Sequence, residues 1–268
     1  MIEVVDRVPT YPGRVKLTPV SGQANTYDMV RADEPIEEGT PINKALFDSL
    51  LDELVSLRKY VNDTVFAISQ RLPLKDISEG AVIGIYENGV LTPFIVITKN
   101  FYQSNRALVL RKDIYKMDSL FDAGDNFYFN SKADRWLNDE YLTDLDAATQ
   151  AVISPVDFEI SDDSMITNLN RKVFLMALWE YGLDSPIARY EGDPFEYFDS
   201  NGKRKAYFND GAVKHYTRTI DTDNKVALII TTAGGVGQVA DPVNTQAGIR
   251  PAFTLPLTYE VSVLASGV

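Results

Sequence analysis

The sequence predicts an α+β protein in three successive parts. Residues 1–44 form an extended N-terminal arm, residues 45–72 form a helix, and residues 73–268 form a domain with a mixed or antiparallel sheet. Three observations support this division: turn-forming residues crowd the first part, a heptad spacing of apolar residues marks the second, and strand-like segments separated by turns fill the third. With 268 residues, 45% of them hydrophobic, the chain is long enough to bury a core.

The arm is predicted from its turn-forming residues, which leave only short apolar pieces such as Val15–Leu17 between them. Segments of this kind acquire order by lying on another surface, so we expect residues 1–44 to contact other proteins. The alternative is a terminus without fixed structure. The turn formers are Pro9, Pro12, Gly13, Pro19, Gly22, Pro35, Gly39 and Pro41.

The helix is predicted from apolar residues that recur at alternating spacings of three and four, which places them at positions a and d of a heptad repeat. A seam of this kind favours packing against an identical helix, so we expect a homo-oligomer, with a trimer preferred. Thr64 and Arg71 are polar members of the seam, and further apolar residues widen the face. The alternative is therefore an amphipathic helix that packs on its own domain. The apolar members of the seam are Phe47, Leu50, Leu54, Leu57, Val61 and Ile68.

The C-terminal domain is predicted from segments with strand periodicity. Asn88–Gly89 is a hairpin turn between two strands within residues 81–100, and residues 106–115 give a further strand. Two helical stretches are expected, at about residues 132–141 and 144–151. The remaining strands are expected in residues 171–181, 215–221, 225–235 and 252–265, with turns at Gly182, Asp199–Gly202 and Asp221–Asn224.

Charge and residue usage exclude several classes of function. The net charge of −12 gives a surface that repels nucleic-acid phosphates and anionic lipid, so we expect no nucleic-acid partner. No apolar run reaches the ~18 residues of a membrane span, and the first residues lack the profile of a secretory signal, so we expect no membrane insertion. The absence of cysteine removes disulfides, thiolate metal sites and cysteine nucleophiles. A single histidine, His215, rules out a two-histidine metal site within one chain.

Few segments carry recognisable chemistry. Ala233–Gly237 lacks the lysine and hydroxyl of a phosphate loop and is interpreted as a turn between strands. Asp221, Asp223 and Asn224 carry oxygen ligands of the kind that calcium takes, but no EF-hand is complete, so we interpret them as turn residues. With 38 acidic residues, chance pairs of carboxylates abound and none is assigned to catalysis. We therefore expect no enzyme activity, no cofactor and no bound metal.

Two parts of the chain resemble known families. Residues Tyr11–Leu51 contain the elements YPGRV, D-x-P and GTP-x-NK, and on these the segment resembles the amino-terminal part of tail proteins from phages and prophages of Gram-positive bacteria. The C-terminal part resembles a domain of unknown function found in phage tail proteins and bacterial surface proteins. Its four motifs are SKADRWLN at Ser131–Asn138, KVFLMALWE at Lys172–Glu180, YTRT at Tyr216–Thr219 and GIRPA at Gly248–Ala252.

The second resemblance implies a C-type-lectin-like fold, which also houses formylglycine-generating enzymes. That oxidative activity needs cysteines, which this chain does not have. The two resemblances together imply a receptor-binding protein of a phage tail or baseplate, located in the virion tail and assembled in the host cytoplasm. Its arm would contact other tail proteins, and its C-terminal domain would bind a bacterial surface glycan or protein. The alternatives are a tail-associated enzyme that degrades glycan or cell wall, and a purely structural tail component.

The residues expected at a ligand site come from an aromatic segment between Leu183 and Tyr216 and from the adjacent arginine. Exposed aromatics on loops stack on sugar rings while neighbouring acids bond the hydroxyls. The alternative is that these rings fill the core. We expect Trp136 and Arg250 to be structural, with Arg250 turned inward onto backbone carbonyls or a buried acid, because a buried guanidinium must be paired. The candidate ligand-binding residues are Tyr190, Tyr197, Tyr207, Tyr216 and Arg218.

Overall fold

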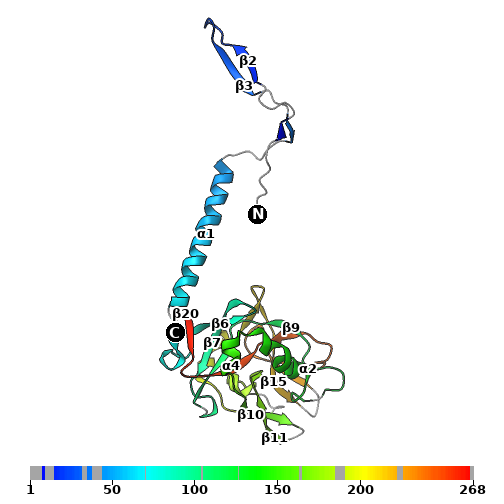
Figure 1. Cartoon of the computed structure of the whole chain (residues 1–268). Helices are drawn as coiled ribbons and strands as arrows, with labels where there is room; N and C mark the ends of the chain where they lie inside the picture. The colour runs from blue at the N-terminus through cyan, green and yellow to red at the C-terminus, as the bar shows by residue number, and fades with distance from the viewer. Residues whose placement is uncertain are drawn as a thin grey trace. The chain divides into compact units, whose positions relative to one another are not determined.

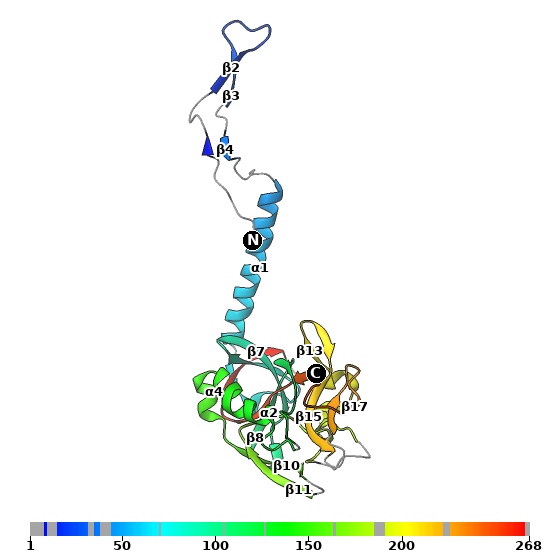
Figure 2. The same ribbon diagram turned by 90° about the vertical axis from the view of Figure 1, so that its right-hand side faces the viewer.

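The computed structural model describes residues 8–9, 15–31, 35–37, 44–69, 71–103, 105–125, 127–162, 165–184, 191–221 and 226–265. The chain is a mixed α+β protein and divides into two compact units, residues 1–63 and 64–268, which are described separately (Figures 1 and 2). None of the described helices combines the length and the apolar character that crossing a lipid bilayer requires.

The first unit contains short antiparallel ladders where the sequence predicts an extended arm. β2 (Val15–Pro19) pairs with β3 (Tyr27–Arg31), and β1 (Val8–Pro9) pairs with β4 (Pro35–Glu37). The apolar side chains of the β2–β3 hairpin are exposed, with Met29 at 71% and Leu17 at 57%. The arm is therefore more regular than expected, but the described hairpin has no buried core of its own.

Helix α1 (Lys44–Ser69) follows the arm, and the division between the two units falls within it. It ends three residues earlier than residue 72, because Arg71–Pro73 form strand β5. Arg71, which the heptad pattern placed on the helix, is therefore a strand residue. Of the seam residues whose side chains are described, all are exposed: Leu50 at 42%, Leu54 at 61%, Leu57 at 58% and Val61 at 47%. Phe47 and Ile68 lie on the helix, but their side chains fall outside the described residues.

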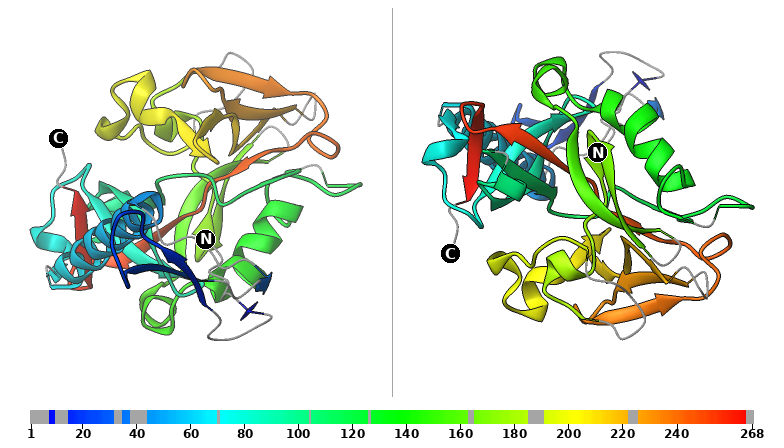
Figure 3. Two further views of the ribbon diagram at one scale, coloured as in Figure 1. Left: turned by 90° about the horizontal axis from the view of Figure 1, so that it is seen from above. Right: turned by 90° about the horizontal axis from the view of Figure 1, so that it is seen from below.

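Two larger sheets organise the described part of the second unit. One has seven strands, all antiparallel, and the other has five, with β15 and β18 parallel. Figure 3 shows the yellow and orange strands on one side of this unit and the cyan and red strands on the other. The first sheet runs β12 (Val173–Phe174), β19 (Ala252–Pro256), β8 (Arg106–Arg111), β7 (Val90–Thr98), β6 (Val82–Glu87), β20 (Glu260–Ala265), β5. The second runs β17 (Val236–Val239), β16 (Val226–Ile230), β15 (His215–Asp221), β18 (Ala247–Ile249), β9 (Lys116–Asp118).

Hairpins and short helices complete the second unit. The Asn88–Gly89 turn between β6 and β7 is confirmed, with φ of 51° and 77°, the left-handed values that a tight hairpin requires. Two further hairpins were not predicted: β10 (Val156–Asp162) with β11 (Met165–Arg171), and β13 (Ala206–Phe208) with β14 (Gly211–Val213). The helices are α2 (Lys132–Trp136), α3 (Leu142–Asp144), α4 (Ala147–Val152) and α5 (Asn201–Arg204), with a π turn at Leu137–Tyr141 and short 3₁₀ turns at Leu74–Asp76, Phe101–Gln103, Trp179–Tyr181 and Glu196–Phe198.

Buried side chains from both sheets form one hydrophobic core. Phe94 on β7 packs against Phe253 on β19 with ring centroids 5.4 Å apart, and Phe101 stacks on Phe174 at 5.5 Å. Trp136 is half-buried against this core, with the ammonium of Lys116 3.8 Å from the centre of its ring. The core therefore joins the two sheets into one packed unit.

The predicted last strand, residues 252–265, is two strands. The chain turns at Leu257–Thr258, so that β20 pairs with β6 and β5 while β19 pairs with β8 and β12. The predicted strand at residues 171–181 is also shorter, because only Val173–Phe174 pair with β19 before a 3₁₀ turn ends at Gly182. In the second segment periodicity does not reveal the break, because residues 173–179 stay apolar through it. In the first segment Pro256 and the polar Thr258 mark the turn.

The GIRPA motif passes from one sheet to the other. Gly248 and Ile249 belong to β18 in the five-stranded sheet, and Ala252 begins β19 in the seven-stranded sheet. Pro251 restricts the residue before it to extended backbone and cannot donate a ladder bond, which suits a crossing point. Arg250 is 1% exposed; its Nε donates to the carbonyl of Arg111 at 2.8 Å and its Nη2 to that of Lys112 at 2.9 Å. As the sequence predicts, Arg250 turns inward onto backbone carbonyls.

We expect Arg250→Ala to lower the free energy of unfolding by ~1–3 kcal/mol, because a buried side chain is lost and the carbonyls of Arg111 and Lys112 lose their donors. Urea denaturation of the variant and the parent protein measures the difference. Arg135→Ala, which removes a guanidinium that is 43% exposed, is the control and should change the midpoint less. Equal midpoints for Arg250→Ala and the parent would contradict a structural role for Arg250.

Candidate ligand-binding site

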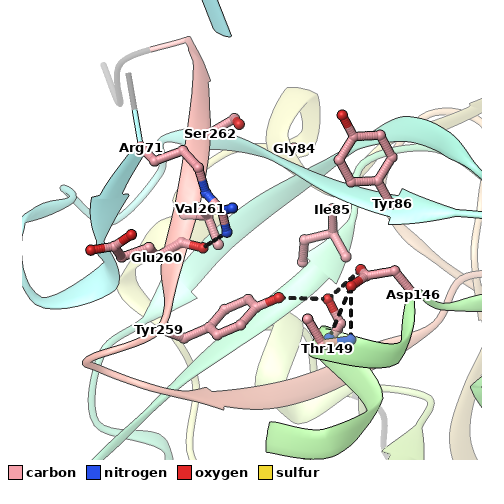
Figure 4. A pocket seen from close by; sticks show the side chains of 11 residues that line it. Arg71, Gly84, Ile85, Tyr86, Asp146, Thr149, Tyr259, Glu260, Val261 and Ser262 are labelled. Carbon is pink, nitrogen blue, oxygen red and sulfur yellow. Dashed lines mark hydrogen bonds between the residues drawn. The ribbon is translucent and has the colours of Figure 1, made fainter. Parts of the chain in front are cut away.

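A small pocket of about 170 Å³ lies at the edge of the seven-stranded sheet (Figure 4). Three neighbouring strands and one helix build it: β5 and β6 flank β20, and the N-terminus of α4 adds to one side. The register pairs Ser262 with both Arg71 and Gly84, which brings residues distant in sequence into one wall. The lining residues are Arg71, Gly84, Ile85, Tyr86, Asp146, Ala148, Thr149, Tyr259, Glu260, Val261 and Ser262.

Asp146 fixes the helical side of this pocket. As the N-cap of α4, its Oδ1 accepts hydrogen bonds from the backbone amides of Ala148 and Thr149, both at 3.1 Å. Its Oδ2 accepts the Thr149 hydroxyl at 2.6 Å, and the Thr149 oxygen lies 2.9 Å from the Tyr259 hydroxyl. Because the single Thr149 proton goes to Asp146, the Tyr259 hydroxyl must donate to Thr149. The Tyr259 oxygen keeps its lone pairs for an acceptor role.

Arg71 supplies the positive charge of the pocket. Its Nη2 donates to the backbone carbonyl of Glu260 at 2.7 Å, and the side chain is exposed. Burial raises the pKa of the Tyr259 hydroxyl above its ordinary value, while the hydrogen bond with Thr149 and the Arg71 charge act against that rise. Tyr259 is therefore neutral and protonated at physiological pH.

A wider groove of about 530 Å³ lies beside Tyr102. Tyr102 has φ of 43°, a left-handed conformation that a bulky residue adopts only when its surroundings hold it. Its hydroxyl donates to Glu180 at 2.7 Å, so the groove wall is tied to the interior. The groove carries three carboxylates and no basic side chain; its lining residues are Glu79, Ile97, Thr98, Asn100, Tyr102, Asp193, Pro194, Phe195 and Glu196.

Beneath this groove lies a fully buried ion pair between Arg218 and Glu180. Arg218 Nη1 and Nη2 reach the two Glu180 oxygens at 2.7 and 2.8 Å, and both side chains are 0% exposed. Arg218 Nε and Nη1 also donate to the carbonyls of Glu159 and Leu175, both at 3.0 Å, and the guanidinium lies 4.6 Å from the Phe158 ring centre. Burial alone lowers the pKa of Arg218, but Glu180 outweighs it and holds that pKa above its ordinary value.

A second buried carboxylate belongs to the same interior network. Glu191 is 0% exposed and accepts the Thr219 hydroxyl at 2.6 Å, while the Thr219 oxygen accepts the amide of Leu178 at 2.9 Å. Gly192 follows it with φ of 77°, and a Cβ at this position would lie 1.7 Å from the Tyr102 hydroxyl. Only glycine therefore fits where this segment approaches Tyr102.

The YTRT strand also holds the one histidine. His215 is fully buried, and neither ring nitrogen has a hydrogen-bond partner among the described residues. Its ring lies 5.8 Å from that of Tyr181, edge to face. Burial, and after it the charge of Arg250, hold the pKa of His215 well below its ordinary value. His215 is therefore neutral at physiological pH.

Two of the candidate ligand-binding residues lie at the surface. Tyr207 on β13 is 45% exposed. Tyr197 is half-buried, with its ring 5.0 Å from that of Phe198 and 5.3 Å from the Lys203 ammonium. Tyr190 lies outside the described residues.

The other two candidate residues are interior, which corrects their assignment to a ligand surface. Tyr216 is 1% exposed and donates its hydroxyl to the carbonyl of Thr245 at 2.8 Å. Arg218 pairs with Glu180, as described above, and has no exposed atom to offer a ligand. Strand β15 is buried on both faces, although its sequence is polar. Its threonines and its arginine can be buried because they form hydrogen bonds inside the domain.

The motif residues of the resembling domain hold each other in place. Asn138 donates to the carbonyl of Val173 at 2.9 Å and accepts from the amides of Lys172 and Val173, so the WLN element holds the KVFL element. Asp134 accepts a two-pronged hydrogen bond from Nε and Nη2 of Arg171, both at 2.9 Å, and its Oδ2 also accepts the backbone amide of Asn130 at 2.9 Å. These motifs are therefore structural rather than surface features.

Sequence reasoning missed the pocket of Figure 4 altogether. Tyr259 and Arg71 lie 188 positions apart and meet only through strand pairing. The one local signal was Asp146 before a helical stretch, which is the pattern of an N-cap. No group of three or more acidic or histidine side chains suited to a metal ion occurs in the described ranges.

Fold and site together define a compact α+β domain with a buried ion-pair network, a small polar pocket and an acidic groove. Residues 104–257 match the sequence profile of a domain of unknown function, DUF6273. Because the match spans more than half of the chain, the chain belongs to this family. All four motifs noted in the sequence fall inside the matched residues. Neither the curated proteins nor the solved structures include a match to the chain.

Proposed function

We propose that the protein is a receptor-binding component of a phage or prophage tail, located in the virion tail and assembled in the host cytoplasm. The observation that carries the proposal is the apolar stripe on helix α1, which is exposed in the single chain. An exposed stripe of this size on a soluble chain indicates a partner surface, and its heptad spacing favours identical helices, with a trimer preferred.

The arm supports the proposal in the same way. Exposed apolar side chains on the β2–β3 hairpin, such as Met29 and Leu17, suit a segment that gains its contacts from another protein. In the proposal that protein is a tail or baseplate component, as the YPGRV and GTP-x-NK elements of Tyr11–Leu51 imply.

The C-terminal domain would provide the receptor-binding part. Its hydrophobic core is packed, and its pockets and exposed aromatics offer polar and ring surfaces to a bacterial glycan or protein. As part of this proposal, the C-terminal domain has the C-type-lectin-like fold that the sequence resemblance implies. A glycan- or wall-degrading tail enzyme and a purely structural component are the competing functions.

Binding of the fluorescently labelled full chain to a panel of intact Gram-positive strains tests the proposal. We expect saturable binding to at least one strain, without release of soluble sugar or peptide from its purified walls. Alanine at both Tyr197 and Tyr207 should weaken that binding, and Tyr27→Ala in the arm is the matched control. Turnover of wall material would establish the enzyme instead, and no binding to any strain would favour the structural component.

A further inference from the structure

We propose that the pocket of Figure 4 binds a single neutral pyranose residue of a glycan. The ligand class follows from the hydrogen-bonding groups of the pocket. The source of the sugar, a bacterial surface, follows from the proposed function and not from the pocket. The argument uses the direction of each hydrogen bond, the charges and the apolar lining.

The inner wall of the pocket offers the Tyr259 hydroxyl oxygen as a hydrogen-bond acceptor. Thr149 gives its proton to Asp146, so Tyr259 gives its own proton to Thr149, and the Tyr259 oxygen is left as an acceptor. Both oxygens of Asp146 already accept hydrogen bonds from α4. A ligand group that meets Tyr259 must therefore donate.

The outer wall offers donors. Arg71 carries five N–H groups, of which one bonds the Glu260 carbonyl. Its charge lies near Tyr259, whose pKa it lowers. In Figure 4 the Arg71 and Tyr259 side chains come from the same side of the pocket. A ligand group between them donates to one and accepts from the other, and an alcohol hydroxyl does both.

The charges disfavour an anion in this place. The Asp146 carboxylate lies in the lining together with the one guanidinium, whereas the Glu260 carboxylate points away from the pocket. A bound carboxylate or fully ionised phosphate has no proton to donate to Tyr259 and would be repelled by Asp146. A neutral polyhydroxylated ligand satisfies Arg71 and Tyr259 without adding charge.

The remaining lining is apolar and fits one sugar ring. Ile85, Val261 and the Cα of Gly84 provide surface for the C–H face of a pyranose, and Tyr86, 38% exposed, adds an aromatic ring at the rim. The volume of about 170 Å³ admits one ring rather than a chain of sugars. Flat apolar faces with hydroxyls at the edge distinguish a pyranose from a linear polyol.

Saturation-transfer NMR on the full chain tests the proposal, with methyl glycosides of glucose, galactose, N-acetylglucosamine and N-acetylgalactosamine as probes up to millimolar concentrations. Acetate and glycerol phosphate serve as the anionic probes. We expect saturation of at least one neutral glycoside and none of the anions. Tyr259→Phe and Arg71→Gln should each weaken its binding about fivefold, the effect of one lost hydrogen bond.

Tyr27→Phe and Arg135→Gln are the matched controls, because they remove the same groups from exposed positions outside the pocket. Melting curves establish that the pocket variants stay folded. If no neutral glycoside shows saturation transfer, the proposal is overturned. Preferential binding of an anion, or unchanged glycoside binding by the Tyr259→Phe and Arg71→Gln variants, overturns it as well.

The same measurements separate this inference from the proposed function. If no glycoside binds but labelled chain still binds bacterial cells, the pocket assignment is wrong and the receptor-binding function stands. If a glycoside binds in the pocket but no strain is bound, the pocket assignment stands and the receptor-binding function is wrong.

Discussion

Replacing Arg218 by methionine is expected to lower the free energy of unfolding by about 3–5 kcal/mol, the typical cost of breaking a buried ion pair on one side. Methionine keeps most of the side-chain volume but leaves the Glu180 carboxylate, 0% exposed, without its cation. The Tyr102 hydroxyl and the Ala177 amide continue to donate to Glu180, so part of its hydrogen bonding survives. Urea denaturation followed by tryptophan fluorescence measures the loss, because both tryptophans lie in the C-terminal unit.

Two further variants make this result specific. Lys203→Met breaks the exposed pair with Asp199 and should shift the denaturation midpoint little, because water screens that pair. Arg218→Met combined with Glu180→Leu removes both charges and should be more stable than Arg218→Met alone. A single variant that loses less than about 1 kcal/mol would show that the pair does not hold the interior together.

Aspartate at both Leu54 and Leu57 is expected to dissociate the proposed homo-oligomer into monomers. The two side chains are 61% and 58% exposed in the single chain, and a coiled coil would bury them as adjacent a and d positions. Two buried carboxylates per helix would cost more than the seam contributes. Light scattering at several concentrations measures the mass, and circular dichroism checks that the C-terminal domain keeps its structure.

The matched control adds the same charge beside the seam. Val55→Asp with Ser56→Asp introduces two aspartates on the same turn at exposed positions b and c, and it should leave the oligomer assembled. If the parent chain is a monomer at high micromolar concentration, α1 is an amphipathic helix and the seam interpretation is wrong. Equal dissociation by both double variants would show that charge, rather than the seam, controls assembly.

Local rules account for the features that the sequence predicted correctly. Asn88–Gly89 supplies the left-handed backbone of a hairpin turn, and neighbouring alternation supplies its two strands. Pro251 excludes a ladder donor, and the buried guanidinium beside it needs acceptors, which it finds in the backbone carbonyls of Arg111 and Lys112. Each of these requires information from only a few consecutive residues, or from one residue type in an apolar setting.

Predictions that depended on distant partners failed. Tyr216 and Arg218 were assigned to a ligand surface because aromatic rings and their polar neighbours suit a glycan, whereas Tyr216 bonds the Thr245 carbonyl and Arg218 pairs with Glu180. The Arg218–Glu180 partners are 38 positions apart, and no periodicity within either segment identifies the other. The sequence did not predict the pocket lined by Tyr259 for the same reason: its residues come from segments that are distant in the chain.

The sequence by itself determined the α+β class, the long helix that follows the first 43 residues, the Asn88–Gly89 hairpin and the inward Arg250, because backbone dihedral preferences and side-chain periodicity act locally. The tertiary structure decided the strand order, which inserts β20 between β6 and β5 and so brings Arg71 next to the residues that follow Tyr259. It also decided which charges are buried, because a buried ion is stable only where its partner arrives through the packing of other segments.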